Sequence, residues 1–195
     1  FPGNYNQLSN QADAILFLSL ISGRNPEFLI GQHVVAAPLL KQSSLEIIPT
    51  GYILIDGGKC TSVQYMSNTM PIPADKTDII ISTAIAGEML GLKLIYLEAG
   101  SGAMTAISPN IIQAVRNAID IPIIVGGGLR NREDVEKAWN NDDYYFIYED
   151  PVVYYSQYRR LESGTILIRK KGEKMEVHVD VILPDGKEFK IDYKE

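Results

Sequence analysis

Three consecutive glycines follow the apolar run 121–125 (IPIIV) and are the first candidate for chemistry. Gly126, Gly127 and Gly128 lack a Cβ, so backbone N–H groups in this loop can approach an anion closely. A helix is expected just beyond, and the unpaired N–H groups of a helix N-terminus attract anions. A tight turn with positive φ would explain one glycine, but not three in a row. The loop is therefore predicted to bind a phosphate group.

A second candidate, the motif YLEAGSG, follows another apolar run. Glu98 comes directly after the apolar residues, so its carboxylate is expected at the mouth of a sheet. There it can accept hydrogen bonds from substrate hydroxyls or act as a general base. The alternatives are that Glu98 pairs with a neighbouring arginine or caps a helix. Tyr96 would add a phenolic donor or serve only in packing, and the segment 100–102 can present amides and a hydroxyl.

Weaker signals come from four other places in the chain. Asp56 and the glycine after it are expected to form a hairpin turn, and the segment up to Pro73 is expected to be a loop over the site. Arg24 could contact an anion or lie in a solvated loop. His33 is expected to be a surface or capping residue, and His178, which alternates with valines, is expected to face water. No Walker loop, dinucleotide fingerprint or zinc-hydrolase motif occurs.

The elements that must position these motifs are short apolar strands alternating with helices. The continuous runs predict buried strands over 14–20, 46–55, 93–97 and 121–125. Helical periodicity with capping signals predicts helices over 25–41, 76–90, 110–119 and 131–140. Such alternation indicates βαβ units and a parallel sheet, which gathers ligands at the carboxyl ends of its strands. The pattern alone does not separate a closed barrel from a doubly wound sheet.

The pattern changes after Trp139. Residues 142–148 could form a fifth parallel strand, and three later segments alternate with a period of two, as expected of an antiparallel meander. These segments are 164–169, 174–183 and 187–193. We therefore expect two domains, a phosphate-binding α/β part over 1–150 and a β-rich extension over 151–195.

Composition limits the classes of function that remain. The chain has 195 residues and a net charge of −6, which argues against a general nucleic-acid binder. Cys60 is the single cysteine, so there is neither a disulfide framework nor a zinc set, and a cytoplasmic location is expected. No apolar run approaches the roughly 20 residues of a membrane span. Transient contact with a membrane surface stays compatible with this composition, and the apolar helix face at 79–90 would allow a homo-oligomer.

Together these motifs resemble the geranylgeranylglyceryl phosphate synthase family, which includes heptaprenylglyceryl phosphate synthases. The resemblance covers about residues 1–135. It is carried most specifically by YLEAGSG and IVGGG, and also by SGRNPEFLIGQ, IIPTGYILIDGG and NTMPIPADKTD. It implies a (β/α)₈ barrel, of which this chain would supply strands four to seven and, with 142–148, an eighth. It also implies a prenyltransferase that joins sn-glycerol 1-phosphate to a polyprenyl diphosphate with Mg²⁺ assistance, in phospholipid biosynthesis.

The resemblance also assigns the site. The family's glycerol-phosphate residues correspond here to Tyr96, Leu97, Glu98, Ala99, Gly100, Ser101, Gly102, Gly126, Gly127 and Gly128. Glu98 and Tyr96 would be catalytic, with Glu98 on the glycerol hydroxyls.

The sequence departs from the family pattern in two places. The family's Mg²⁺-binding aspartate lies on strands that precede the matched residues, so no metal ligand is assigned in this chain. Tyr148 stands near the glycine of the family's second phosphate clamp and is followed by two carboxylates, which would repel a phosphate.

Two other readings stay open at this stage. The chain could be a catalytically incomplete fragment or a designed chimera that only binds phosphate ligands. It could also be a different barrel enzyme that acts on a sugar phosphate, although IPTGYILIDGG and NPEFLIGQ go beyond a generic phosphate site.

Overall fold

The computed structural model describes residues 8–9, 12–130, 134, 138, 144–146, 163–171, 174–182 and 188–194. The chain divides into two compact units, Phe1–Tyr154 and Tyr155–Glu195. Of the predicted helix over 131–140, only residues 134 and 138 are described, and both are helical. Within the described residues, every helix is too short or too polar to cross a bilayer.

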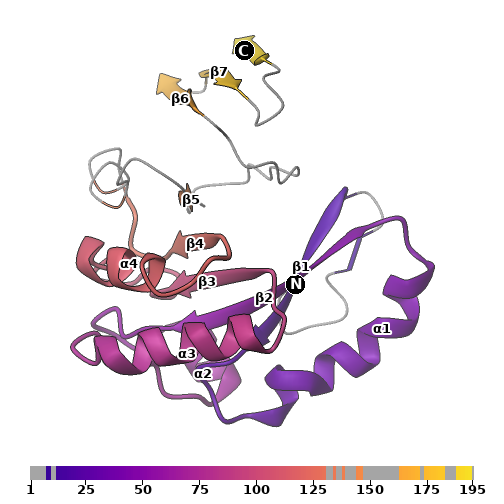
Figure 1. The fold of residues 1–195 in the computed structure, drawn as a ribbon, viewed down its shortest axis with the longest axis vertical. Coiled ribbons are helices and arrows are strands. Elements are labelled where there is room, and N and C mark those ends of the chain that lie inside the picture. The colour runs from indigo at the N-terminus through magenta and orange to yellow at the C-terminus, as the bar shows by residue number, and fades with distance from the viewer. Residues whose placement is uncertain are drawn as a thin grey trace. The chain divides into compact units, whose positions relative to one another are not determined.

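The first unit contains a parallel sheet of five strands (Figure 1). Its strands are β1 (Ala14–Leu20), β2 (Glu46–Leu54), β3 (Leu94–Glu98), β4 (Ile123–Gly126) and β5 (Tyr144–Phe146). Their order in the sheet is their order in the chain, and every neighbouring pair is parallel. A doubly wound sheet reverses its strand order at a switch point, whereas a (β/α)₈ barrel does not. The sequential order therefore fits part of a barrel, and the predicted strands are confirmed to within two residues at each end.

Helices fill the connections between the strands. They are η2 (Glu27–Gly31), α1 (Gln32–Gln42), α2 (Ser62–Ser67), α3 (Thr77–Met89) and α4 (Pro109–Arg116). The Ser108-Pro109 start signal is confirmed, because Ser108 is the N-cap residue of α4 and its Oγ accepts a hydrogen bond from the N–H of Ile111 at 3.4 Å. The predicted helix over 25–41 begins with the π-helical turn η2 before α1 continues.

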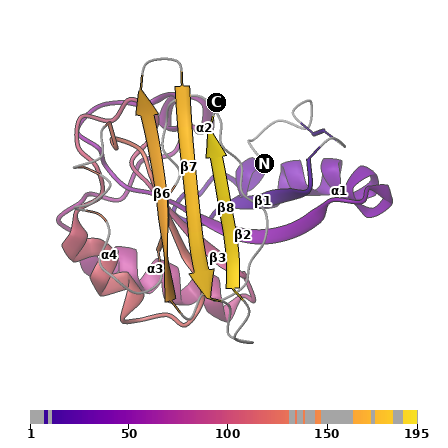
Figure 2. The same cartoon turned by 90° about the horizontal axis from the view of Figure 1, so that it is seen from above.

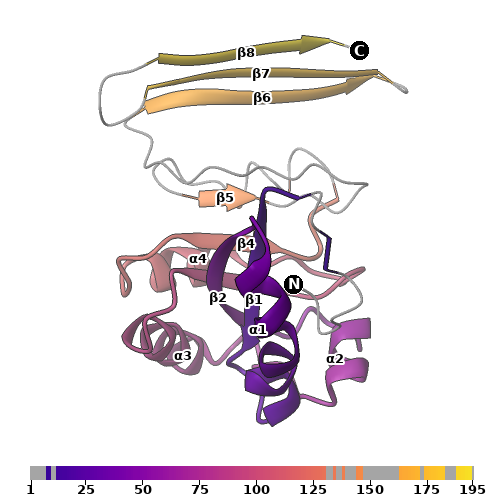
Figure 3. The same cartoon turned by 90° about the vertical axis from the view of Figure 1, so that its right-hand side faces the viewer.

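One face of the sheet is covered by helices and forms the main core. Leu97 of β3 belongs to the same buried cluster as Ile80 of α3 and Ile112 of α4. At the other end of the sheet, Phe17 of β1 packs with Ala36 of α1. The strand register places these residues on one face, and α1 and α3 lie on the same side of the sheet in Figure 3. The burial of these large apolar side chains stabilises the unit.

The opposite face of the sheet contains a second, smaller cluster. Ile48, Leu94 and Ile124 are its buried residues, and Tyr96 packs against them. Because side chains alternate along a strand, residues 94, 96 and 98 share this face while 95 and 97 share the other. In a barrel, the face without helices points inward, toward the layers that lie beneath the active site.

His33 is a correction to the sequence analysis. It is 5% exposed, and its ring meets Phe17 edge-on with the ring centroids 4.4 Å apart. Burial lowers the pKa of the imidazole below its ordinary value of 6.5. The prediction of a surface residue was wrong because α1 exposes apolar residues such as Val34 and Val35. Side-chain polarity therefore did not mark which side of this helix is buried.

The second unit is a three-stranded antiparallel sheet, as the period-two pattern predicted. Its strands are β6 (Ser163–Lys171), β7 (Lys174–Ile182) and β8 (Glu188–Lys194). β7 lies between the other two, as Figure 2 shows. In the register, His178 is opposite Leu167 on one side and Asp192 on the other. For this unit the structure describes the backbone and not the side chains. The expectation that the side chain of His178 faces water therefore stays a prediction.

Candidate active site

The site is built from the carboxyl end of β3. Tyr96 and Glu98 lie on the face of the sheet opposite α3 and α4, and Glu98 is only 4% exposed. Glu98 Oε1 accepts a hydrogen bond from the N–H of Gly100 at 2.7 Å, so the loop after the strand orients the carboxylate. The ring of Tyr96 meets that of Tyr52 in a T-shaped contact with centroids 5.1 Å apart. A buried, oriented carboxylate beside a phenol is an arrangement that can bind or deprotonate a hydroxyl.

Gly126 and Gly127 lie directly against these side chains, and Gly128 lies against the backbone of Thr105 and Ala106. β3 and β4 pair so that Glu98 is opposite Gly126, and the N–H of Ala99 donates to the carbonyl of Gly126 at 3.0 Å. A methyl group on Gly126 would lie 2.6 Å from the hydroxyl oxygen of Tyr96 and would also collide with Glu98 Oε2. Glycine is required here because any larger residue would displace both side chains.

Gly127 has a second reason to be glycine. Its φ is +77°, in the left-handed region that other residues seldom adopt. A methyl group on it would lie 2.5 Å from Glu98 Oε1 and 2.7 Å from the backbone nitrogen of Gly100. The loop after β4 therefore packs against the loop after β3, and the two loops together form the candidate site.

The sequence-predicted residues do not all serve this pocket in the same way. Leu97 points into the main core with no exposed surface, so only its backbone belongs to the site region. The amides of Ala99 and Gly100 are already used, by Gly126 and Glu98 respectively. Ser101 and Gly102 are exposed in the turn that follows. The structure thus brings Tyr96 and Glu98 together with Gly126 and Gly127, whereas Leu97 and Ala99 contribute backbone alone.

The segment after β2 flanks the candidate site, but it is not a hairpin as predicted. Ile55 forms a parallel bridge with Ile72, and α2 lies between them, so the chain makes a long excursion instead of a tight turn. Asp56 Oδ1 accepts the N–H of Gly58 at 2.9 Å, a local turn that mimics a hairpin signal in sequence. The carbonyl of Gly57 accepts N–H groups from the loop after β3, those of Met104 at 2.8 Å and Thr105 at 3.1 Å.

Lys59 and Thr61 are site-flanking residues that the sequence analysis missed. A methyl group on Gly102 would lie 3.4 Å from Lys59 Nζ, so this ammonium group reaches the turn after β3. Thr61 packs against Gly100 so closely that a methyl group there would lie 2.5 Å from its side chain. The only signal in the sequence was the position of both residues just after the Asp56 turn.

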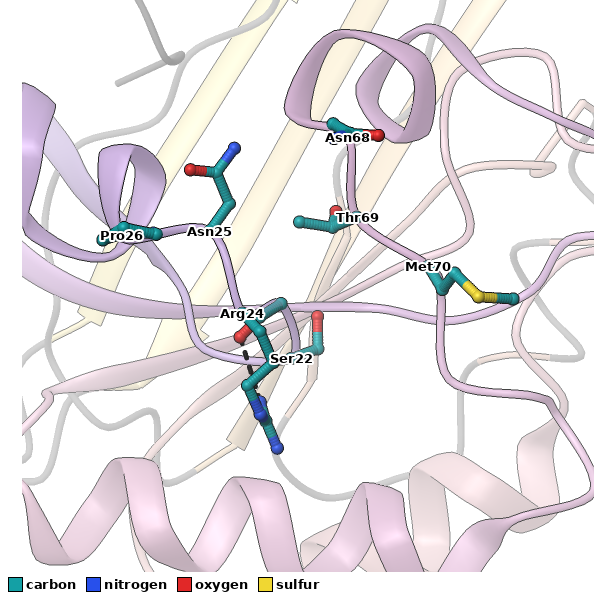
Figure 4. Close-up of a pocket in the computed structure, with 8 residues that line it drawn as sticks. Ser22, Arg24, Asn25, Pro26, Asn68, Thr69 and Met70 are labelled. Carbon is teal, nitrogen blue, oxygen red and sulfur yellow. Dashed lines mark hydrogen bonds between the residues drawn. The ribbon is translucent and has the colours of Figure 1, made fainter.

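A separate hollow of about 640 Å³ lies at the carboxyl end of β1 (Figure 4). It is lined by Ser22, Gly23, Arg24, Asn25, Pro26, Asn68, Thr69 and Met70. Arg24, a candidate for anion binding, donates from Nη1 to the carbonyl of Gly23 at 2.9 Å (Figure 4). Asn25 Nδ2 donates to the carbonyl of Ser67 at 2.6 Å and so fastens the two sides of the hollow together.

Within the part of the chain that is described, no group of three or more His, Cys, Asp or Glu side chains is close enough to hold a metal. The carboxylate of Glu98 already accepts a backbone N–H. The described residues therefore do not fit a Mg²⁺ site by themselves.

Comparison with known proteins gives a consistent family. The PcrB family matches residues 1–161. The geranylgeranylglyceryl phosphate synthase of Spirosoma linguale is 60% identical over 138 residues, which are 71% of this chain and 55% of that protein. The protein of the same name from Thermococcus gammatolerans is 43% identical over 138 residues, 71% of this chain and 54% of its own.

Two solved structures share the fold. The wild-type GGGPS from Thermoplasma volcanium has a TM-score of 0.66 at 37% identity, over 71% of this chain and 55% of that one. The (S)-3-O-geranylgeranylglyceryl phosphate synthase from Thermoplasma acidophilum, in complex with its substrate sn-glycerol-1-phosphate, has a TM-score of 0.65 at 34% identity, over 72% and 56%. The chain thus spans a little more than half the length of the relatives it matches. The family match over residues 1–161 leads to one conclusion: this chain belongs to the PcrB family.

Proposed function

We propose that this chain carries the glycerol-phosphate site of a prenyltransferase. The enzyme would join sn-glycerol 1-phosphate to a polyprenyl diphosphate, geranylgeranyl or heptaprenyl, and give a prenylglyceryl phosphate for ether phospholipid synthesis. The names of the relatives support this reaction, as does the sn-glycerol-1-phosphate bound in the Thermoplasma acidophilum structure. The observation that carries the proposal is the close approach of Glu98 to Gly126 and Gly127, with Tyr96 beside Gly126.

The two loops of the proposed pocket would bind different parts of glycerol phosphate. The phosphate would lie on the glycine loop, where the absence of side chains lets backbone N–H groups approach. Lys59, an exposed cation beside Gly102, would add positive charge near that group. The glycerol hydroxyls would lie on the other wall, against Glu98 and Tyr96.

The proposed step balances with the residues of this pocket. The glycerol hydroxyl oxygen attacks the allylic carbon of the polyprenyl diphosphate, a C–O ether bond forms, and the bond to the diphosphate breaks. The proton of the hydroxyl passes to the carboxylate of Glu98, and the diphosphate leaves with the electron pair. Tyr96 would orient the hydroxyl by hydrogen bonding. In such a step, a positioned general base typically contributes a factor of about 10² to 10⁴ to the rate.

Mg²⁺ belongs to the proposal through the resemblance alone. When bound, it would neutralise the leaving diphosphate. Its ligands would come from the strands that precede the matched residues in the family, so no step is assigned to it here.

Three finer features belong to the proposal as well. A cytoplasmic location is supported by the single cysteine, Cys60, which is free and exposed. Transient contact with a membrane surface is supported by the polyprenyl substrate and by exposed Met66 and Met70. A homo-oligomer is supported by exposed apolar residues at the end of α3, Met89 and Leu90.

Calorimetry with the purified chain and glycerol 1-phosphate, followed by product analysis with geranylgeranyl or heptaprenyl diphosphate and Mg²⁺, tests the proposal. Binding of glycerol 1-phosphate together with ether product supports it in full. Binding without product would leave the chain as a phosphate-ligand binder, the alternative reading. If glycerol 1-phosphate does not bind, the site assignment itself is wrong. sn-Glycerol 3-phosphate is the matched control ligand, because it is the enantiomer of sn-glycerol 1-phosphate and differs only in the configuration at C2.

A further inference from the structure

Arg130 connects the loop after β4 with the loop after β3, the two loops that would form the walls of the proposed pocket. It follows the glycine loop directly, and its Nη2 donates to the carbonyl of Ala103, in the loop after β3, at 2.5 Å. The two residues are 27 positions apart in the chain. The backbone of Arg130 is held in turn, because its N–H donates to Asp134 Oδ2 at 3.0 Å. The guanidinium group therefore links loops that belong to different strands.

The acceptor of this bond lies in a turn whose shape matters for the site. The N–H of Ala103 donates to the carbonyl of Gly100 at 3.0 Å, which closes the turn 100–103. Gly100 begins this turn, and its own N–H holds the carboxylate of Glu98. Ala103 itself is fully buried. A shift of the Ala103 carbonyl would thus be transmitted through a short hydrogen-bonded turn to the carboxylate.

The surrounding contacts show that the loop after β3 is held from both sides. On one side, the carbonyl of Gly57 accepts the N–H groups of Met104 and Thr105. On the other, a methyl group on Gly128 would lie 2.8 Å from the backbone of Thr105. The contact at Gly128 is one of close packing, whereas the bond from Arg130 is directional and charge-assisted.

We infer that Arg130 is a positioning residue that sets the spacing between the phosphate wall and the hydroxyl wall of the pocket. This inference rests on the proposed function, in which one ligand bridges both walls. A glycerol phosphate must satisfy the glycine loop and Glu98 at the same time, so its affinity depends on that spacing. Inorganic phosphate occupies the glycine loop alone, so its affinity does not.

The test compares the two ligands in Arg130→Met, with glycerol 1-phosphate and inorganic phosphate titrated separately by calorimetry. We expect the Kd of glycerol 1-phosphate to rise about tenfold, in line with loss of one charge-assisted hydrogen bond, and that of phosphate to change less than about twofold. Arg130→Lys keeps the charge and one donor, and should give an intermediate rise of about threefold. If Arg130→Met fails to fold, the same comparison of the two ligands is made with Arg130→Lys.

Arg116→Met is the matched control. Arg116 also donates from Nη1 to a backbone carbonyl, that of Ile119 at 2.9 Å, but at the end of α4 and away from the pocket. It should leave both affinities unchanged. Equal weakening of both ligands in Arg130→Met would mean that the arginine acts on the phosphate through its charge, and would overturn the inference. Unchanged affinity for glycerol 1-phosphate would overturn it as well.

A second readout does not depend on ligand binding. Hydrogen–deuterium exchange at residues 100–106 should be faster in Arg130→Met than in the native chain, and unchanged in Arg116→Met. If the native chain fails to bind glycerol 1-phosphate, the proposed function fails, and the exchange experiment then decides by itself whether Arg130 holds the loop. Equal exchange in the native chain and in Arg130→Met would contradict the link.

Discussion

The two faces of β3, a strand of five residues, have different roles. Ile95 and Leu97 have no exposed surface and lie in the core beneath α3 and α4. Tyr96 and Glu98 alternate with them on the opposite face, against the glycine loop after β4. One face is apolar and holds the unit together, while the other ends in a buried carboxylate. Stability and chemistry should therefore be separable by mutation along a single strand.

The largest expected effect comes from Gly127→Asp on the site face. An aspartate there must adopt a φ of +77° and would place its Cβ 2.5 Å from Glu98 Oε1. The strain costs about 1–3 kcal/mol, and a second carboxylate would repel the phosphate. We expect affinity for glycerol 1-phosphate to fall by more than about 100-fold, measured by calorimetry.

Gly91→Asp is the control for this variant. Gly91 also has a positive φ, +84°, but open space surrounds it at the end of α3. It should lose stability from backbone strain and keep its affinity for the ligand. If Gly127→Asp still bound glycerol 1-phosphate, the glycine loop could not be part of the binding site.

Glu98→Gln should separate chemistry from stability most cleanly. The amide keeps the shape of the carboxylate and can still accept the N–H of Gly100, but it cannot take up a proton. We expect the rate of ether product formation to fall about 10² to 10⁴-fold, while the urea unfolding midpoint changes little.

Glu88→Gln provides the comparison. Glu88 Oε1 also accepts backbone N–H groups, from Asp120 at 2.7 Å and Ile121 at 3.1 Å. These two partners precede β4, so Glu88 lies at the end of that strand opposite to the glycine loop. Its loss should leave the rate unchanged. Equal rates in Glu98→Gln and the native chain would exclude Glu98 as the base.

Leu97→Ala, one residue away on the core face, should show the opposite behaviour. Removing a fully buried leucine side chain typically costs about 2–5 kcal/mol of unfolding free energy. Below its lowered melting temperature, the variant should still bind glycerol 1-phosphate with nearly native affinity. Chemical denaturation and calorimetry on the same sample test both statements. A large loss of affinity in the folded variant would show that the two faces are not independent.

Ser108→Ala should have a smaller effect, confined to the helical side. Ser108 caps α4, and loss of such a cap costs about 1 kcal/mol. Ser82→Ala is its control, because the Ser82 hydroxyl donates to the carbonyl of Asp78 on an exposed part of α3 and should matter less. Equal unfolding free energies for the two variants would argue against the cap.

The smallest effect should come from the pH dependence at His33, between α1 and β1. Burial lowers the pKa of His33 in the folded chain, so the unfolded chain binds the proton more tightly. The free energy of unfolding should therefore be unaffected by this residue well above pH 6.5 and should fall as the pH drops below that value. His33→Gln should flatten the decline, which urea unfolding at a series of pH values would reveal. An equally steep decline in His33→Gln would assign it to other groups.

Much of the parallel unit could be predicted from sequence because its signals are local. Continuous apolar runs located the strands, and serine or glycine next to a periodic segment located the helix ends. The choice between barrel and doubly wound sheet could not be read from these signals, because it depends on strand order, which is a property of long-range pairing. The resemblance to a family supplied that choice.

The site was predicted less evenly. Tyr96, Glu98 and the glycines carry strong local signals, because they lie in an apolar strand or at the end of one. Lys59, Thr61 and Arg130 carry weak ones, since the contacts of each with the loop after β3 depend on long-range folding. The hairpin predicted at Asp56 was wrong for the same reason: a local turn is compatible with either a hairpin or a long excursion, and only the bridge from Ile55 to Ile72 distinguishes them.

The hydrogen bond from the N–H of Gly100 to Glu98 has a further consequence, for the kinetics of recognition. A carboxylate that is held in place before any ligand arrives loses little side-chain entropy when the ligand binds. Association should then be governed by diffusion and orientation, with no slow rearrangement of the acid group. Differences in affinity among glycerol phosphate analogues should accordingly appear in how fast they leave the pocket.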